Sequence, residues 1–202
     1  MIAIVLAGLG FAVAGFACGK IARTMYAGQS TFDDGPRSIV VELWIVALCA
    51  MIVGMGLAAH GASGLQLATV AVIVAALAAC TITDCQIGIV PDLFTLVPLA
   101  ALLVMSGSRG NFTPFLRALF VAVPFAGAAL LSNGRGMGSG DVKLAALAGA
   151  LLGARDATIA ITIACVGAFV ISKLLRNRNE PISFAPYIGA GIGFVLMLGS
   201  TA

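Results

Sequence analysis

The chain has 202 residues, of which 61% are hydrophobic and only 9% are charged. Its mean hydropathy is +1.12, whereas soluble domains are about one quarter charged. These values exclude an ordinary water-soluble domain, because a soluble core cannot absorb so much apolar sequence, and they indicate a bundle embedded in lipid. We therefore expect residues 1–202 to form a single membrane-embedded domain, with no room for a separate soluble one.

Apolar runs follow one another along the whole chain. They cover residues 2–19, 41–59, 65–83, 92–106, 114–132, 142–153, 157–173 and 186–200. Most are near the ~20 residues that a helix needs to cross a ~30 Å hydrocarbon core, and a helix satisfies its own backbone hydrogen bonds in lipid. Alternation suited to an outer-membrane barrel is absent. The sequence predicts an all-α, polytopic membrane bundle with about eight transmembrane segments.

The basic residues predict how this bundle is oriented. The first run has no positive charge before it, unlike a signal peptide, and Lys20 and Arg23 follow it, so we expect the N-terminus outside. Eight crossings then place most basic residues in the cytoplasm, provided that the short sixth run crosses, with local thinning of the bilayer. The cytoplasmic set is Lys20, Arg23, Arg37, Arg135, Lys143, Lys173, Arg176 and Arg178, and the outer set is Arg109, Arg117 and Arg155.

Two acidic loops fall on the cytoplasmic side in this topology. They are DCQIGIVP at 84–91 and NGRGMGSGD at 133–141. We expect Asp84 to end the third helix and Asp141 to begin the sixth, so that the two carboxylates meet at one membrane face. A carboxylate in such a place costs free energy, and a functional role is the default hypothesis.

Two carboxylates held close together cannot both ionise, so they share a proton and titrate as a pair. One can then act as a base toward water while the other donates a hydrogen bond to a carbonyl oxygen. This is the chemistry of aspartic peptide hydrolysis, and it needs no metal and no cofactor. Asp84 and Asp141 are the candidate pair.

Glycines alternate with other residues just before Asp141. A backbone without Cβ permits close approach of an extended substrate, so we expect Gly138 and Gly140 to contact a substrate strand that pairs beside this loop. Three further stretches, GFACG, GALLG and GAGIG, match Gly-x-x-x-Gly, which predicts close helix packing.

Five stretches of the chain, in order, carry a family resemblance. They are GFAVAGFACGKIAR, PRSIVVELWIVAL, TDCQIGIVPD around Asp84, GMGSGDVKL around Asp141, and EPISFAPYIGAG. The fourth has the GxGD pattern, and the third has an Asp followed by Val-Pro-Asp. Together they resemble the type IV prepilin peptidase family over nearly the whole chain.

The resemblance implies an activity and a place for it. Members cleave the short leader from prepilins or pseudopilins at the cytoplasmic face of the bacterial inner membrane, and motif matching makes Asp84 and Asp141 the catalytic pair. Their substrates present a basic leader, a Gly before the cut and a hydrophobic helix after it. The expected partners are therefore this substrate helix and the lipid bilayer, with no nucleic acid, and the oligomeric state is left open.

The loop at 20–40 differs from that of the longer members of the family. Those members carry a cytoplasmic insert with paired CxxC zinc ligands, whereas this loop contains no cysteine. The five cysteines of the chain show no metal spacing, so we expect no zinc and no cofactor. The compact form resembles the peptidases of tight-adherence (Flp-type) pili, and the N-methyltransferase activity of some longer members is left open.

Several charged residues also have a structural alternative. Asp141 could be an N-cap of the sixth helix, and Asp84 could simply end the third helix at the headgroups. Asp92 is interpreted as an N-cap, and Glu42 as a structural residue that pairs with a nearby Arg. Lys143 is interpreted as an interfacial anchor that could also tune Asp141.

Two other functions are weighed against the peptidase. An ion- or proton-coupled transporter could use the same carboxylates, but no inverted repeat is evident and both acids sit at one face instead of the midplane. An intramembrane protease of the presenilin or signal-peptide-peptidase type shares GxGD. In that type the first Asp follows Tyr, whereas Asp84 follows Thr83, and the Pro-Ala-Leu segment is missing here.

Overall fold

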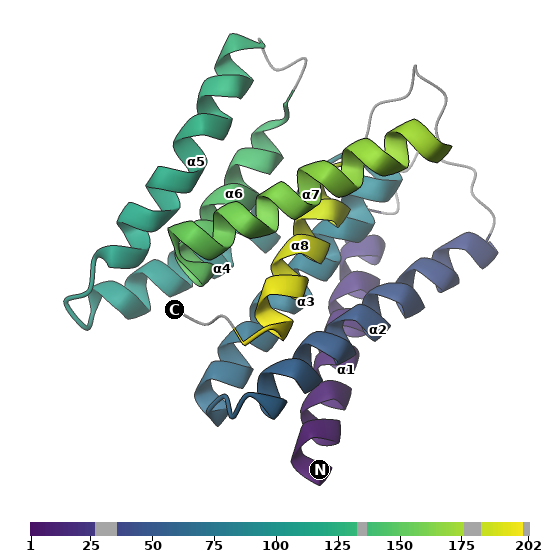
Figure 1. Ribbon diagram of the computed structural model, residues 1–202. Coiled ribbons are helices and arrows are strands. Elements are labelled where there is room, and N and C mark those ends of the chain that lie inside the picture. The colour runs from purple at the N-terminus through teal and green to yellow at the C-terminus, as the bar shows by residue number, and fades with distance from the viewer. Residues whose placement is uncertain (27–35, 133–136, 176–182, 200–202) are drawn as a thin grey trace.

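The computed structural model describes residues 1–26, 36–132, 137–175 and 183–199, without the side chains of 36–41 and 175. Within these ranges the chain is all-helical (Figure 1). The helices are α1 (Ile2–Tyr26), α2 (Pro36–Ala59), α3 (Gly64–Ile87), α4 (Asp92–Gly107), α5 (Thr113–Leu131), α6 (Ser139–Leu152), α7 (Ala154–Leu175) and α8 (Ala185–Met197). The predicted all-α bundle is confirmed.

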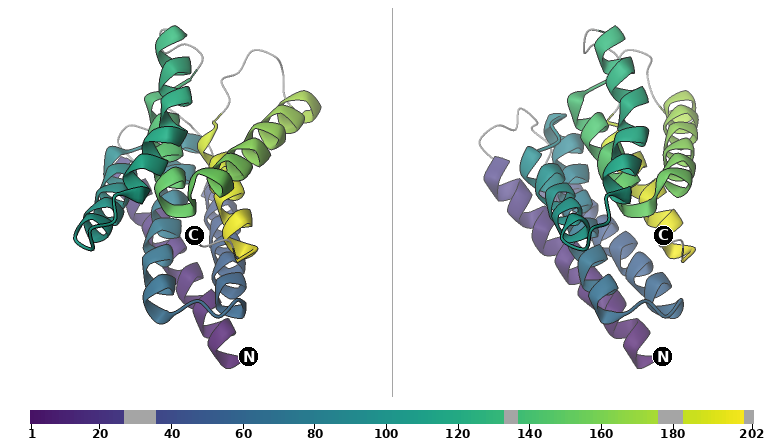
Figure 2. Two further views of the ribbon diagram at one scale, coloured as in Figure 1. Left: turned by 60° about the vertical axis from the view of Figure 1, so that its left-hand side comes forward. Right: turned by 90° about the vertical axis from the view of Figure 1, so that its left-hand side faces the viewer.

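The helices alternate in direction along the chain. In Figure 1, α1, α3, α5 and α7 run upward while α2, α6 and α8 run downward, and the right-hand view of Figure 2 shows α4 nearly end-on. The end of α3 and the beginnings of α6 and α8 therefore lie toward the same end of the bundle. The directions of the other seven helices agree with the predicted topology, whereas α4 lies across them, so a crossing by α4 stays a prediction. Which end faces the cytoplasm stays a prediction.

Five helices, α1, α2, α3, α5 and α7, are long and apolar enough to cross a membrane. The other three, α4, α6 and α8, have 16, 14 and 13 residues. At about 1.5 Å per residue, α6 rises only about 21 Å, less than the ~30 Å hydrocarbon core. A multi-pass membrane bundle is supported, and the count of eight crossings stays a prediction.

The outer surface of the long helices is apolar. On α5, Phe115 is 53% exposed, Leu116 61% and Phe120 69%. Apolar area that continues over several helices is rare on a soluble monomer, and it is the surface that a lipid solvent favours. The multi-pass arrangement therefore rests on exposed side chains as well as on helix length.

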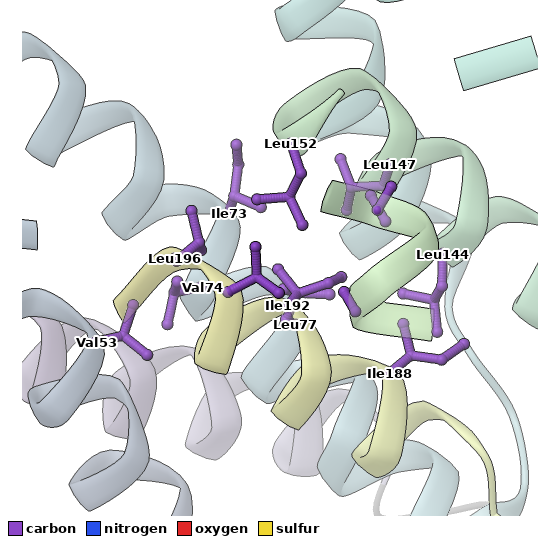
Figure 3. Close-up of a cluster of buried hydrophobic side chains, with 14 of the residues drawn as sticks. Val53, Ile73, Val74, Leu77, Leu144, Leu147, Leu152, Ile188, Ile192 and Leu196 are labelled. Carbon is purple, nitrogen blue, oxygen red and sulfur yellow. The ribbon is translucent and has the colours of Figure 1, made fainter. Parts of the chain in front are cut away.

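The core lies where α3, α6 and α8 meet. Figure 3 shows Leu77 of α3, Leu144 of α6, and Ile188 and Ile192 of α8 directed toward one another. All four belong to one cluster of buried hydrophobic side chains. This cluster fixes α6 and α8 against α3, and these three helices carry the candidate site.

The Gly-x-x-x-Gly stretches lie at helix contacts, as predicted. A Cβ on Gly15 of GFACG would lie 3.2 Å from the Cβ of Ala50 on α2. One on Gly149 of GALLG would lie 2.7 Å from the Arg117 carbonyl oxygen on α5. Both distances are tighter than ordinary contact, so the absence of a side chain is what lets these helices approach.

Two predicted helix ends were wrong. Asp84 does not end α3, which continues to Ile87 and closes at Gly88 in the left-handed conformation (φ 65°). Asp141 does not begin α6: Gly138 is its N-cap, Ser139 its first residue, and Asp141 its third. A charge marks where an apolar run stops, whereas the helical hydrogen bonds continue to the next residue that can leave the helix.

Some predicted features lie outside the described residues. These are the middle of the 20–40 loop, residues 133–136 of the glycine-rich loop, the side chain of Arg37, and all of Arg135, Arg176 and Arg178. Of the basic residues that predict the orientation, the structure describes the side chains of Lys20, Arg23, Arg109, Arg117, Lys143, Arg155 and Lys173.

Candidate functional site

Asp84 lies in the last turn of α3 and is held by the beginning of α8. Its side chain is buried, with 8% of the residue exposed, and Oδ2 accepts a hydrogen bond from the Ala185 backbone N–H at 3.0 Å. The Ser183 hydroxyl donates to the Asp84 carbonyl oxygen, also at 3.0 Å. The first N–H groups of a helix have no partner within that helix, so α8 offers donors that fix the orientation of this carboxylate.

Asp141 lies in the first turn of α6, which is not among the five candidate spans. Its Oδ2 accepts a hydrogen bond from the Gly138 N–H at 3.3 Å. The pKa of Asp141 is raised above its ordinary value near 3.8, chiefly by burial. The Gly138 N–H works against this shift, and the negative charge of Asp84 adds to it.

The fold thus brings the two predicted acids together. Asp84 and Asp141 are 57 positions apart in the numbering, yet the negative charge of Asp84 raises the pKa of Asp141. Each has a backbone N–H donor; Asp84 is buried, and Asp141 is half-buried. Two acids in this relation can share one proton, and one of them can be ionised while the other is neutral.

Gly138 and Gly140 differ in their surroundings. A Cβ on Gly140 would lie 2.7 Å from the Cβ of Val90, in the connection between α3 and α4. A Cβ on Gly138 would lie 3.8 Å from Asp141 Oδ2 and 3.9 Å from the Gly140 nitrogen, which are ordinary contacts. Gly140 is therefore required for packing. The substrate contacts expected of both glycines stay a prediction.

Lys143 forms an ion pair with Asp92. Its Nζ contacts Asp92 Oδ1 and so joins the first turn of α6 to the first turn of α4. Asp92 is the first residue of α4, and Pro91 is its N-cap, so the interpretation of Asp92 as the N-cap was wrong by one position. Lys143 is not among the groups that move the pKa of Asp141.

Glu42 also lies at this end of the bundle. The side-chain amide of Gln86, in the last turn of α3, donates to Glu42 Oε2 at 3.5 Å. Among the described side chains the partner is thus Gln86, and the side chain of Arg37 lies outside the described residues. Glu42 links α2 to the turn of α3 that carries Asp84, which agrees with a structural role.

The described residues hold one notable cavity and no cluster of metal-ligand side chains. In residues 1–26, 36–132, 137–175 and 183–199, no group of three His, Cys, Asp or Glu side chains could hold a metal ion. A cavity of about 300 Å³ lies between the beginnings of α3 and α5 and the ends of α4 and α6, and is lined by Thr69, Leu102, Arg109 and Ala150 among others. It lies toward the opposite end of α3 from Asp84.

Comparison with known proteins identifies the family. The sequence profile of the type IV leader peptidase family matches residues 71–173, about half of the chain. The matched range includes both Asp84 and Asp141. The chain belongs to the type IV leader peptidase family.

Two curated relatives agree with this membership. Both are named prepilin leader peptidase/N-methyltransferase and come from Burkholderia pseudomallei, strains 1026b and K96243. Each is 33% identical over 181 residues, which cover 82% of this chain and 56% of the relative. The chain therefore spans about half the length of these relatives of the leader peptidase family. No solved structure matches it significantly.

The sequence did not single out every residue of the site in this family member. Ser183 and Ala185 contact Asp84, although the sequence marks only their stretch, EPISFAPYIGAG, through the family resemblance. The available signal was Pro186 near the start of an apolar run, which is typical of a helix beginning. Nothing in the sequence indicated that this helix begins against Asp84, because a backbone N–H donor leaves no mark on residue type.

Proposed function

We propose that this protein is a membrane aspartic endopeptidase that removes the leader peptide of type IV (Flp-type) prepilins or pseudopilins. It acts at the cytoplasmic face of the bacterial inner membrane, and residues 1–202 form one membrane-embedded peptidase domain. The observation that carries the proposal is that the negative charge of Asp84 adds to the raised pKa of Asp141, in a chain of the leader peptidase family. The transporter alternative has no support from the family or from the relatives.

The two carboxylates would act as one unit. The ionised member accepts a proton from a water molecule, and that water attacks the scissile carbonyl carbon. The protonated member donates a hydrogen bond to the carbonyl oxygen and then passes its proton to the leaving amine. The raised pKa of Asp141 supports this scheme, since a proton is then retained in the pair at a pH where a free carboxyl group would have lost it.

The surroundings of the pair suit a membrane-anchored substrate. Family substrates carry a basic leader before a hydrophobic helix, so the cut falls at the boundary between water and lipid. Asp84 lies in the last turn of a candidate span, which is where such a boundary is expected. The apolar outer surface of the bundle lets a substrate helix approach from the lipid. Both relatives are also named N-methyltransferase, and the proposal here concerns the peptidase activity alone.

The test is to express the chain together with an epitope-tagged prepilin and to follow the size shift of the prepilin on a gel. Asp84→Asn and Asp141→Asn should each abolish processing while the protein still accumulates in the membrane. Asp156→Asn is a matched control, because Asp156 is the third residue of α7 as Asp141 is of α6, and it should process normally. Retained processing in Asp84→Asn or Asp141→Asn would remove that residue from the catalytic pair.

A further inference from the structure

The first turn of α6 contacts the chain just after α3 at two points. At the first, Gly140 packs against Val90, with room for no side chain: a Cβ would lie 2.7 Å from Val90 Cβ. At the second, Lys143 pairs with Asp92. Both partners come from the short stretch that follows the helix of Asp84, and both contacts lie within two positions of Asp141.

The two contacts lie on one face of α6, because Gly140 and Lys143 are three positions apart in the helix. An α-helix turns about 100° per residue, so Lys143 projects roughly 200° around α6 from Asp141. Lys143 therefore contacts Asp92 of α4 on a side of α6 away from the one that carries Asp141. Val90 and Asp92 are joined to Asp84 through the end of α3 and the Gly88 turn, whose N–H bonds back to the Asp84 carbonyl oxygen at 3.0 Å. A movement of α6 at either contact changes its position relative to Asp84.

We propose that Val90–Gly140 and Asp92–Lys143 form a two-point clasp that sets the separation of Asp84 and Asp141. Asp92 and Lys143 are then positioning residues of the catalytic pair, and the glycine before Asp141 serves packing and not substrate binding. This inference rests on the proposed function, because it concerns the geometry of the same two acids.

The expected size of the effect follows from the contacts. Ordinary contact begins at 3.4 Å, so a Cβ on Gly140, at 2.7 Å from Val90 Cβ, must move α6 or the connection by a few tenths of an ångström or more. A misplacement of about 1 Å at a reacting centre can lower the rate on the order of 10²-fold. The ion pair is partly exposed, with side-chain exposures of 26% for Lys143 and 65% for Asp92. Such pairs contribute little to stability, so removing this one should change the rate without unfolding the protein.

The first test is a size swap at the Val90–Gly140 contact. With purified enzyme and a prepilin peptide, Gly140→Ala should lower kcat by about tenfold or more and leave KM unchanged. In a Val90→Gly background, which removes the opposing Cβ, the same substitution should cost little. Gly127→Ala on α5 is the matched control, since a Cβ there meets nothing within 4 Å. A rise in KM at constant kcat would assign Gly140 to substrate binding and overturn the clasp.

The second test is a double-mutant cycle across the ion pair. Asp92→Asn and Lys143→Gln should each lower kcat several-fold, and the double variant should be no slower than either single one, because each single change already removes the contact. Additive losses, or a loss at Lys143 alone, would mean that Lys143 acts directly on Asp141 and would overturn the positioning role. If Asp84→Asn still cleaves, the proposed function itself fails. If Asp84→Asn is inactive but Gly140→Ala behaves like Gly127→Ala, the clasp alone fails.

Discussion

The contact between α7 and α8 allows the packing to be tested with one substitution at two places. A Cβ on Gly191 of α8 would lie 2.2 Å from the Ala160 carbonyl oxygen and 3.0 Å from its carbonyl carbon, both backbone atoms of α7. A backbone cannot change rotamer, so Gly191→Ala must separate the two helices by roughly 1 Å. On the same pair of helices, a Cβ on Gly167 would meet Tyr187 Cδ1 at 3.7 Å, an ordinary contact.

The two substitutions should therefore change the free energy of unfolding in opposite directions. Overpacking in a core costs about 1–3 kcal/mol, whereas alanine is favoured over glycine in a helix by up to ~1 kcal/mol. Gly167→Ala benefits only from the higher helix propensity of alanine. Gly191→Ala has the same benefit, but its Cβ also clashes with the backbone of α7. The free energies of unfolding of the two variants should differ by about 1–3 kcal/mol, and for a chain of this size each kcal/mol shifts Tm by about 2–4 °C.

Thermal unfolding in one detergent, followed by circular dichroism, measures this difference. We expect Gly191→Ala to melt below the wild type and Gly167→Ala to melt at or above it. Gly191→Ala should also process prepilin more slowly, because α8 carries the Ala185 N–H that holds Asp84. Equal melting temperatures for the two variants would refute the packing of α7 against α8 described here.

Two further predictions concern the acids. Ser183→Ala removes the hydroxyl donor to the Asp84 carbonyl oxygen, but that oxygen still accepts a hydrogen bond from the Gly88 N–H. The lost hydrogen bond costs about 1 kcal/mol, so the variant should cleave a prepilin peptide less than about tenfold more slowly than the wild type. Complete inactivation would contradict this prediction. Because burial raises the pKa of Asp141 above 3.8, the folded protein binds a proton there that the unfolded chain releases. Stability from this group is therefore lost as pH rises from about 4 through the raised pKa. Over that pH range, the melting temperature of Asp141→Asn should rise relative to that of the wild type. A difference in melting temperature that does not change with pH would contradict the raised pKa of Asp141.

The sequence was sufficient to predict the helices because their signal is local. Each apolar run corresponds to one helix, and the run at 92–106 became Asp92–Gly107. The ends of the helices are harder to predict, because the apolar composition can stop several residues before the helical hydrogen bonds do. Asp84 stopped the apolar run, yet the helix continues to Ile87, because Gly88 is the first residue there that takes the left-handed conformation.

The partners of the two acids could not be predicted in the same way. The motifs singled out Asp84 and Asp141, and the alternation of helices brought them to one end of the bundle. The donor from Ala185, the contact of Val90 with Gly140 and the pairing of Lys143 with Asp92 depend on how helices distant in sequence pack together. Lys143 shows the limit: its place in the sequence favoured an interfacial anchor that could also tune Asp141, and nothing in the sequence indicated that its side chain contacts Asp92 of α4.

The central claim is that Asp84 and Asp141 catalyse as one unit. The most direct test is to compare cleavage rates of a prepilin peptide by purified Asp84→Asn, Asp141→Asn and the double variant. General acid–base catalysis contributes about 10²–10⁴-fold, and residues that act as a unit are strongly non-additive. We predict that both single variants lose at least about 10²-fold and that the double variant is no slower than either. Losses that multiply in the double variant, or a single variant that keeps its rate, would contradict the account.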